Sequence, residues 1–136
     1  MTDVLTREQR SRCMAAIRSK HTKPELAVRA ALRHLGCKYT LHRKTLPGRP
    51  DIVISRERKA IFVHGCFWHM HRCRYGKVTP AANAAFWRKK RRSNVQRDRQ
   101  KLKELRRAGW KVLTIWECWT RTPTKLATRI ADFLQS

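Results

Sequence analysis

The ten residues from His64 to Cys73 constrain this chain more than any other part of its sequence. They read HGCFWHMHRC and contain three histidines, two cysteines and an adjacent pair of large aromatic residues, Phe67 and Trp68. Histidine and cysteine are common zinc ligands, and histidine also exchanges protons near neutral pH. On a basic protein an aromatic pair is suited to stacking on nucleic-acid bases or wedging between them. The segment therefore predicts that metal, acid–base and base-stacking chemistry are held in one place.

A closed zinc site needs four ligands, and this segment offers three of them. Cys66, His71 and Cys73 have short spacings that one loop can wrap around a metal ion. Cys118 directly follows the apolar run KVLTIW, so the end of a strand would hold it in place as the fourth ligand. His69 could replace His71, because their side chains point the same way if the segment is extended. The alternative to zinc is a set of buried thiols beside a surface histidine.

The composition points to a polyanionic partner. The chain carries 33 lysines and arginines against 9 acids, which gives a formal net charge of +24 in 136 residues. Nucleic acid is the expected partner of such a charge. An anionic membrane is a poorer match, because the basic residues are spread along the whole chain rather than gathered on one amphipathic helix. No apolar run is long enough to cross a membrane and the N-terminus lacks an apolar leader, so we expect a cytoplasmic protein.

Periodicity and helix signals predict one α/β domain. The core order α-β-β-β-α-β-α indicates a mixed sheet flanked by helices. Thr22 opens the first core helix and Gly36 closes it. Asn83 is expected to cap a long basic helix that ends near Gly109, with Ser93–Asn94 as a candidate break. The other expected elements are an N-terminal helix over Arg7–Ser19, a short strand over Tyr39–His42, a hairpin of strands Asp51–Ser55 and Ala60–His64, a strand over Lys111–Trp116 and a last helix from Thr122.

The acids are few enough for elimination, and two of them are hard to explain structurally. Asp51 follows a Gly-Arg-Pro loop and begins an apolar strand, where a hairpin would bring it close to His64. Asp98 lies on the apolar face of the long helix, where a carboxylate needs a metal or a partner; the alternative is an ion pair with an arginine. Glu25 follows Thr22 at capping-box spacing, so a capping role is its alternative. A carboxylate suited to Mg²⁺ beside histidines favours metal-assisted hydrolysis of phosphodiesters in DNA or RNA.

Four stretches of the chain resemble the very short patch repair (Vsr) endonucleases: LPGRPDIV, IFVHGCFWHMHRC, NVQRDR and GWKVLTIWEC. The match runs from about Thr6 to Cys118, in order and with matching spacings. The resemblance implies a single endonuclease domain over 1–136, with a restriction-endonuclease-like fold and a structural zinc site. It also implies a Mg²⁺-dependent enzyme that nicks one strand 5′ to the thymine of a T:G mismatch left by deamination of 5-methylcytosine. The E-x-K of the ordinary restriction fold is replaced by Phe62-x-His64.

The resemblance also implies where the metal ions bind. Asp51 would hold two Mg²⁺ ions together with the backbone carbonyl of Val63, and Glu25 would act through metal-bound water. One structural Zn²⁺ ion would be bound by Cys66, His71, Cys73 and Cys118.

Roles in proton transfer and in DNA recognition follow from the same resemblance. His69, oriented by Asp98, would be the general base, and His64 would support the transition-state charge. The N-terminal helix, within residues 1–20, would contact DNA. At the mismatch the implied residues are Phe67 and Trp68 as a wedge from the major-groove side, Met14 entering from the other side, and Lys90 and Asn94 near the mismatched pair.

The implied partner is double-stranded DNA with a T:G mismatch, bound by a monomeric, bacterial-type protein associated with the nucleoid. Other DNA repair proteins are further candidate partners. Two alternatives stay open. One is a zinc-containing nucleic-acid-binding protein without catalysis, which would leave Asp51 and Asp98 unexplained. The other is a restriction-like nickase or endonuclease that acts on other DNA sites. For Phe67 and Trp68, packing in the core is the alternative to wedging.

Overall fold

The computed structural model describes residues 22–77 and 82–136, and its elements follow the core order expected from the sequence. The sheet has four strands in the order β1-β2-β3-β4; the first two pairs are antiparallel and β3–β4 is parallel. The expected mixed α/β sheet is therefore confirmed. The elements are α2 (Lys23–His34), β1 (Thr40–Leu41), β2 (Ile52–Ile54), η1 (Ser55–Glu57), β3 (Lys59–His64), α3 (Arg74–Lys77), α4 (Ala84–Arg107), β4 (Lys111–Trp116), η2 (Glu117–Arg121) and α5 (Pro123–Gln135).

The register of the sheet brings chemically important segments to one edge. The expected hairpin is present, with Ile52 of β2 opposite Ile61 of β3. In the parallel pair, His64 lies opposite Trp116, so β3 and β4 end side by side. The His/Cys segment (residues 64–73) begins at the end of β3, and Cys118 lies just after the end of β4. The two regions therefore start close together at one end of the sheet.

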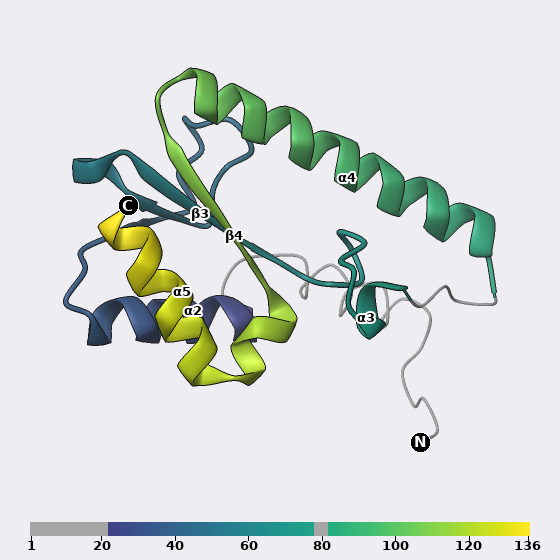
Figure 1. Cartoon of the computed structure of the whole chain (residues 1–136). Coiled ribbons are helices and arrows are strands. Elements are labelled where there is room, and N and C mark those ends of the chain that lie inside the picture. The colour runs from purple at the N-terminus through teal and green to yellow at the C-terminus, as the bar shows by residue number, and fades with distance from the viewer. Residues whose placement is uncertain (1–21, 78–81) are drawn as a thin grey trace.

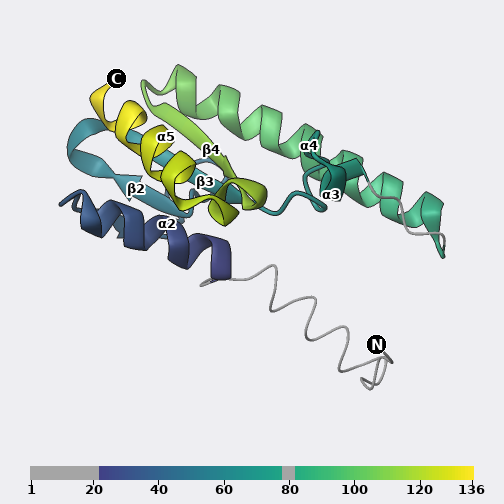
Figure 2. The same ribbon diagram turned by 60° about the horizontal axis from the view of Figure 1, so that its bottom comes forward.

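The main core lies between the sheet and the two helices α2 and α5, which pack side by side (Figures 1 and 2). Each helix presents apolar residues four positions apart, and each central strand adds branched side chains. Full burial of one such side chain contributes about 1.5–3 kcal/mol. The buried core residues are Val28, Leu32, Ile52, Ile54, Ile61, Ile115, Leu126 and Ile130.

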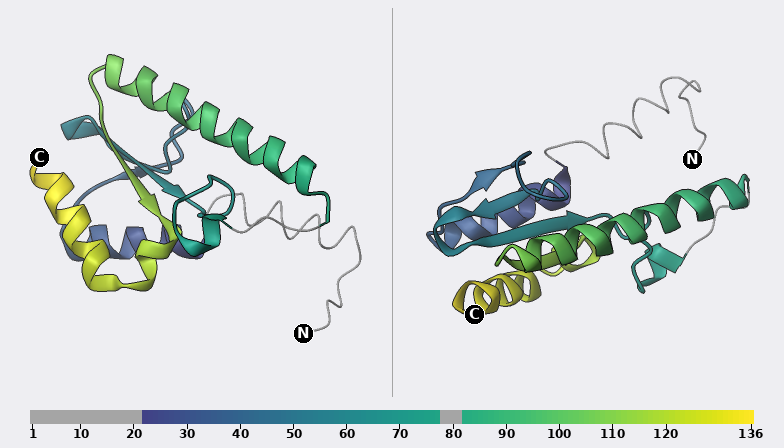
Figure 3. Two further views of the ribbon diagram at one scale, coloured as in Figure 1. Left: turned by 45° about the vertical axis from the view of Figure 1, so that its right-hand side comes forward. Right: turned by 90° about the horizontal axis from the view of Figure 1, so that it is seen from above.

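Helix α4 covers the opposite face of the sheet, and its N-terminal half extends past the sheet above α3 (Figures 1 and 3). Buried Leu105 anchors the C-terminal half. The helix is continuous over 24 residues, so the break considered at Ser93–Asn94 is wrong. Mid-helix serine and asparagine cost only about 0.5 kcal/mol each, which neighbouring long-chain residues tolerate. In the described parts of the chain, no helix is long and apolar enough to cross a membrane.

The helix ends test the capping predictions. Thr22 caps α2, since its Oγ1 accepts a hydrogen bond from the Glu25 N–H at 3.4 Å. Gly36 follows the helix end with a left-handed φ of 72°, which suits glycine. Asn83 stands at the N-cap position of α4, as expected, but it adopts a left-handed φ of 57° and its side chain makes no capping hydrogen bond. The helix expected over Arg7–Ser19 lies outside the described residues.

Candidate active site

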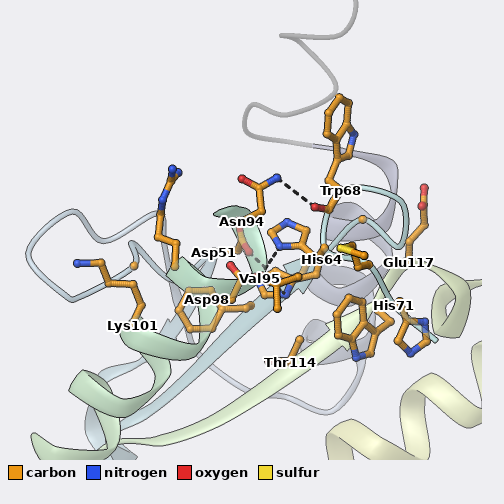
Figure 4. Close-up of a pocket in the computed structure, with 18 of the residues that line it drawn as sticks. Asp51, His64, Trp68, His71, Asn94, Val95, Asp98, Lys101, Thr114 and Glu117 are labelled. Atoms are coloured by element: carbon orange, nitrogen blue, oxygen red, sulfur yellow. Dashed lines mark hydrogen bonds and ion pairs between the residues drawn. The ribbon is translucent and has the colours of Figure 1, made fainter. Parts of the chain in front are cut away.

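A cleft of about 1220 Å³ opens where the ends of β3 and β4 meet the middle of α4 (Figure 4). Residues from α2, the loop before β2, the His/Cys segment and α4 contribute to its wall. All five residues with expected catalytic roles line it: Glu25, Asp51, His64, His69 and Asp98. Cationic side chains also line the cleft, which favours a polyanionic ligand; they are Arg49, Arg72, Arg92, Arg97, Arg99 and Lys101.

Two histidines share one carboxylate in this cleft. His69 Nδ1 lies 2.5 Å from Asp98 Oδ2, and His64 Nδ1 lies 3.9 Å from the same oxygen. The two imidazole rings are stacked, with centroids 3.9 Å apart. Asp98 therefore pairs with a histidine, and an ion pair with an arginine is not needed to explain it. The bond at Nδ1 leaves His69 Nε2 as the nitrogen that can take up a proton.

Burial sets the protonation state of His64. It lowers the pKa of His64 to about 3, an effect that His69 strengthens and Asp98 opposes. His64 is therefore a neutral imidazole at physiological pH, able to donate one hydrogen bond and accept another.

A second cluster in the same cleft brings two carboxylates together, those of Glu25 and Asp51. Asp51 Oδ2 accepts a hydrogen bond from the Val63 N–H at 2.7 Å. In a β-strand the N–H and C=O of one residue point toward the same side of the strand. The Val63 carbonyl therefore points toward the side on which the Asp51 carboxylate lies. Burial, reinforced by nearby Glu25, raises the pKa of Asp51 to about 6. A buried carboxylate with a raised pKa has too little positive charge around it, and hard oxygen ligands suit Mg²⁺.

The Glu25 carboxylate lies between a histidine and an arginine. One oxygen lies 2.6 Å from His42 Nε2 and the other 2.5 Å from an Arg29 guanidinium nitrogen. Ligand atoms of Glu25, His42 and Asp51 all lie within 4.8 Å of one another. Thr22 supplies the cap, as the sequence predicted, and the Glu25 carboxylate lies close to Asp51.

The four expected zinc ligands lie close together beyond the C-terminal ends of β3 and β4. Ligand atoms of Cys66, His71, Cys73 and Cys118 lie within 4.8 Å of one another. Cys118 Sγ is 3.5 Å from His71 Nδ1, and tetrahedral zinc spaces its ligand atoms by about 3.3–3.8 Å. Burial raises the pKa of the Cys66 thiol to about 12, which a bound cation would reverse. The cluster is consistent with a zinc site, and it contains His71, whereas His69 pairs with Asp98.

The aromatic pair is not part of the main core and packs against α4. The rings of Phe67 and Trp68 have centroids 5.2 Å apart, and both pack against Trp87 of α4, at 5.8 and 5.5 Å. Both are partly exposed. Phe86, which precedes Trp87 in α4, is 57% exposed and contacts the Trp87 ring. Packing in the central core is therefore not the role of this pair.

The remaining expected DNA-contacting residues are distributed along α4. Asn94 lines the cleft and donates a hydrogen bond to the Trp68 carbonyl at 3.0 Å. Lys90 does not line the cleft, and its Nζ lies 5.8 Å from the Phe86 ring centroid. Met14 lies outside the described residues.

Three residues of this site were not found by sequence reasoning: His42, Trp87 and Arg91. His42 stands at the end of a two-residue strand with a φ of 47°, and no spacing rule links it to Glu25. Arg91 is one of many cations on α4, so its burial was not visible. A helical spacing signal did exist, because 87, 91, 94 and 98 fall on one face of α4.

An α/β domain whose cleft holds carboxylates and histidines among cationic side chains defines a nuclease class of protein. The family model described as DNA mismatch endonuclease Vsr matches residues 2–75. The chain belongs to this family and is a DNA-nicking endonuclease, as the sequence motifs implied.

Similar proteins match over most of the chain. Type II nicking enzyme V.XorIIP of Xanthomonas oryzae pv. oryzae (strain KACC10331 / KXO85) is 43% identical over 134 residues, 98% of either protein. Type II nicking enzyme V.NmeAIP of Neisseria meningitidis serogroup A / serotype 4A (strain DSM 15465 / Z2491) is 43% identical, covering 87% of this chain and 84% of the relative. DNA mismatch endonuclease Vsr of Escherichia coli (strain K12) is 42% identical, covering 93% and 80%.

Proposed function

We propose that this chain is a Mg²⁺-dependent endonuclease that nicks one strand 5′ to the thymine of a T:G mismatch, in repair after deamination of 5-methylcytosine. The observation that carries the proposal is the arrangement of residues 67–69: the aromatic pair adjoins a histidine already bonded to Asp98. A wedge that unstacks bases would thus stand next to a group that accepts a proton. Unstacking costs a few kcal/mol and less at a mismatch, so this arrangement favours weakened duplexes.

The carboxylates would form the metal site. Asp51 and the Val63 carbonyl would be ligands of two Mg²⁺ ions, and Glu25 would act through metal-bound water. When bound, Mg²⁺ would stabilise the charge that develops on the phosphate. The cationic side chains around the cleft would hold the DNA backbone.

The histidines would carry the proton transfer and the charge. His69 would take a proton from the attacking water through Nε2, while Asp98 holds its ring in the tautomer that leaves this nitrogen free. His64, neutral and stacked on His69, would donate a hydrogen bond to a phosphate oxygen in the transition state. A nick needs one active site, so a monomer is the proposed state.

A second candidate function comes from the relatives, several of which bear the name type II nicking enzyme. A restriction-like nickase would cut matched DNA at a site of its own. We therefore expect labelled duplexes that differ in one base pair to separate the functions: with Mg²⁺, the T:G duplex should be nicked on the thymine strand and the T:A and C:G duplexes left intact. Cutting of matched duplexes would favour the restriction-like activity, and absence of any cutting would remove both.

The zinc site leads to a separate prediction. Purified protein should contain about one Zn²⁺ per chain, and Cys73→Ala should lose the metal and precipitate, because structural zinc contributes folding free energy. Elemental analysis and thermal melting of both proteins measure this. Cys37 is a suitable control, since it lies outside the cluster and Cys37→Ala should keep its zinc. Soluble, active wild-type protein without zinc would contradict the assignment.

A further inference from the structure

One face of α4 contacts three consecutive residues of the His/Cys segment in order. Trp87 packs against the rings of the aromatic pair, and Asn94 donates to the Trp68 carbonyl. Asp98 binds His69. These helix residues, with Arg91 between them, follow the spacing of 4, 3 and 4 residues that keeps side chains on one face. The wedge and the histidine of the active site are therefore attached to the same rigid element.

Arg91 is the buried member of this face. The residue is 1% exposed, while Lys90 before it is half-buried and Arg92 after it is exposed. Its Nε donates a hydrogen bond to the Phe67 carbonyl at 2.6 Å, and a terminal guanidinium nitrogen donates to the Gly76 carbonyl. The guanidinium carbon also lies 4.4 Å from the Phe67 ring centroid.

These contacts explain why an arginine occupies the position. Burying a cation costs free energy unless its N–H donors find hydrogen-bond acceptors. The carbonyls of Phe67 and Gly76 are such acceptors for Arg91. The planar guanidinium presents donors in fixed directions and stacks on aromatic rings, which lets one side chain reach the Phe67 and Gly76 carbonyls together. A lysine has one ammonium on a flexible stem and cannot reproduce this geometry.

We propose that Arg91 is a specificity-determining positioning residue, which sets where the Phe67–Trp68 pair stands relative to the His69–Asp98 pair. It acts through the backbone and ring of Phe67. The inference rests on the mismatch function proposed above, and it adds that discrimination between mismatched and matched DNA depends on a side chain buried away from the cleft.

The test compares Arg91→Lys with Arg106→Lys, the same chemical change at an exposed position near the end of α4. Zinc-loaded protein without Mg²⁺ is added to a T:G duplex with 2-aminopurine at the neighbouring base step, whose fluorescence rises on unstacking. Arg91→Lys should lose most of this rise at saturating protein, and its preference for T:G over T:A binding should fall about tenfold, the loss expected for a charged hydrogen bond. Its zinc content and its binding to the T:A duplex should match wild type, and Arg106→Lys should behave as wild type throughout.

Each other outcome overturns the proposal. A normal fluorescence rise and normal discrimination in Arg91→Lys would show that the contact is not needed. Equal loss of affinity for both duplexes, with loss of zinc, would make Arg91 a fold-stabilising residue only. If wild-type protein produced no rise in fluorescence on the T:G duplex, the aromatic pair would not act as a wedge. That result would contradict the proposed function itself rather than the role of Arg91 alone. Arg91→Met, which keeps the aliphatic stem, repeats the comparison without the charge.

Discussion

Replacing Asp51 by asparagine or alanine should reduce single-turnover nicking by about a thousandfold or more, because metal ions contribute several kcal/mol of transition-state stabilisation. Asp51 contributes its carboxylate to the proposed metal site, and it is not one of the main-core residues. Binding of the T:G duplex should persist, since the cationic residues and the aromatic pair are untouched. Rates are measured with excess enzyme and Mg²⁺, and binding is measured without Mg²⁺.

Asp132→Asn is the matched control, because it removes one exposed carboxylate of α5 and should nick as wild type. Thermal melting of the zinc-loaded proteins without Mg²⁺ then separates a lost ligand from a lost fold. Burial raises the pKa of Asp51 to about 6 from 3.8, so the native state holds the proton more tightly and wild-type stability falls as pH rises between these values. Above pH 6, Asp51→Asn should melt no lower than wild type. A variant with near wild-type nicking would show that the metal site lies elsewhere.

His69→Ala should lose at least about a hundredfold in single-turnover nicking, within the usual range for a general base. Asp98→Asn should lose somewhat less, because the imidazole remains but its tautomer is no longer held. The double variant should lose little more than His69→Ala alone, since the two residues act as one unit through a 2.5 Å contact.

The measurement is a double-mutant cycle on a T:G duplex, with zinc content determined for every variant. Glu104→Gln offers a control on α4 itself, six residues beyond Asp98, where the carboxylate contacts Lys101 and lies outside the cleft lining. Multiplying losses in the double variant would separate His69 from Asp98. Loss of zinc in His69→Ala would transfer His69 to the metal cluster, the assignment that the sequence had left open.

The helices and strands could be predicted because their signals are local. Thr22 as a cap, Gly36 as a stop and the apolar runs of β3 and β4 act within a few residues of chain. The start of α4 after Asn83 was predicted correctly, although the Asn83 side chain makes no capping hydrogen bond, and the prediction failed at the proposed break around Asn94. The side chain of Asn94 bonds the Trp68 carbonyl, a partner 26 residues away, and such a partner has no local signature.

Site residues could be predicted where their residue type is rare in the chain. With few acids in a very basic chain, Asp51 and Asp98 stood out, and the resemblance to Vsr endonucleases supplied their expected roles. Neither source indicated His42 or Arg91. A histidine near a strand and an arginine on a basic helix are ordinary features until the fold places one against Glu25 and buries the other under Phe67.

By itself the sequence determined the mixed α/β class, the clustering of zinc-type ligands in one loop and the attraction to DNA, because composition, periodicity and short spacings carry that information. Only the tertiary structure decided which histidine joins the cysteines. His69 and His71 differ by two positions and are equivalent in pattern, but the parallel pairing of β3 with β4 brings Cys118 to His71, while α4 brings Asp98 to His69. The deciding contacts are His69–Asp98 and His71–Cys118, whose residues lie 29 and 47 positions apart in the chain. The free energy of each contact depends on the distance between the two residues in the fold, which a single stretch of sequence does not give.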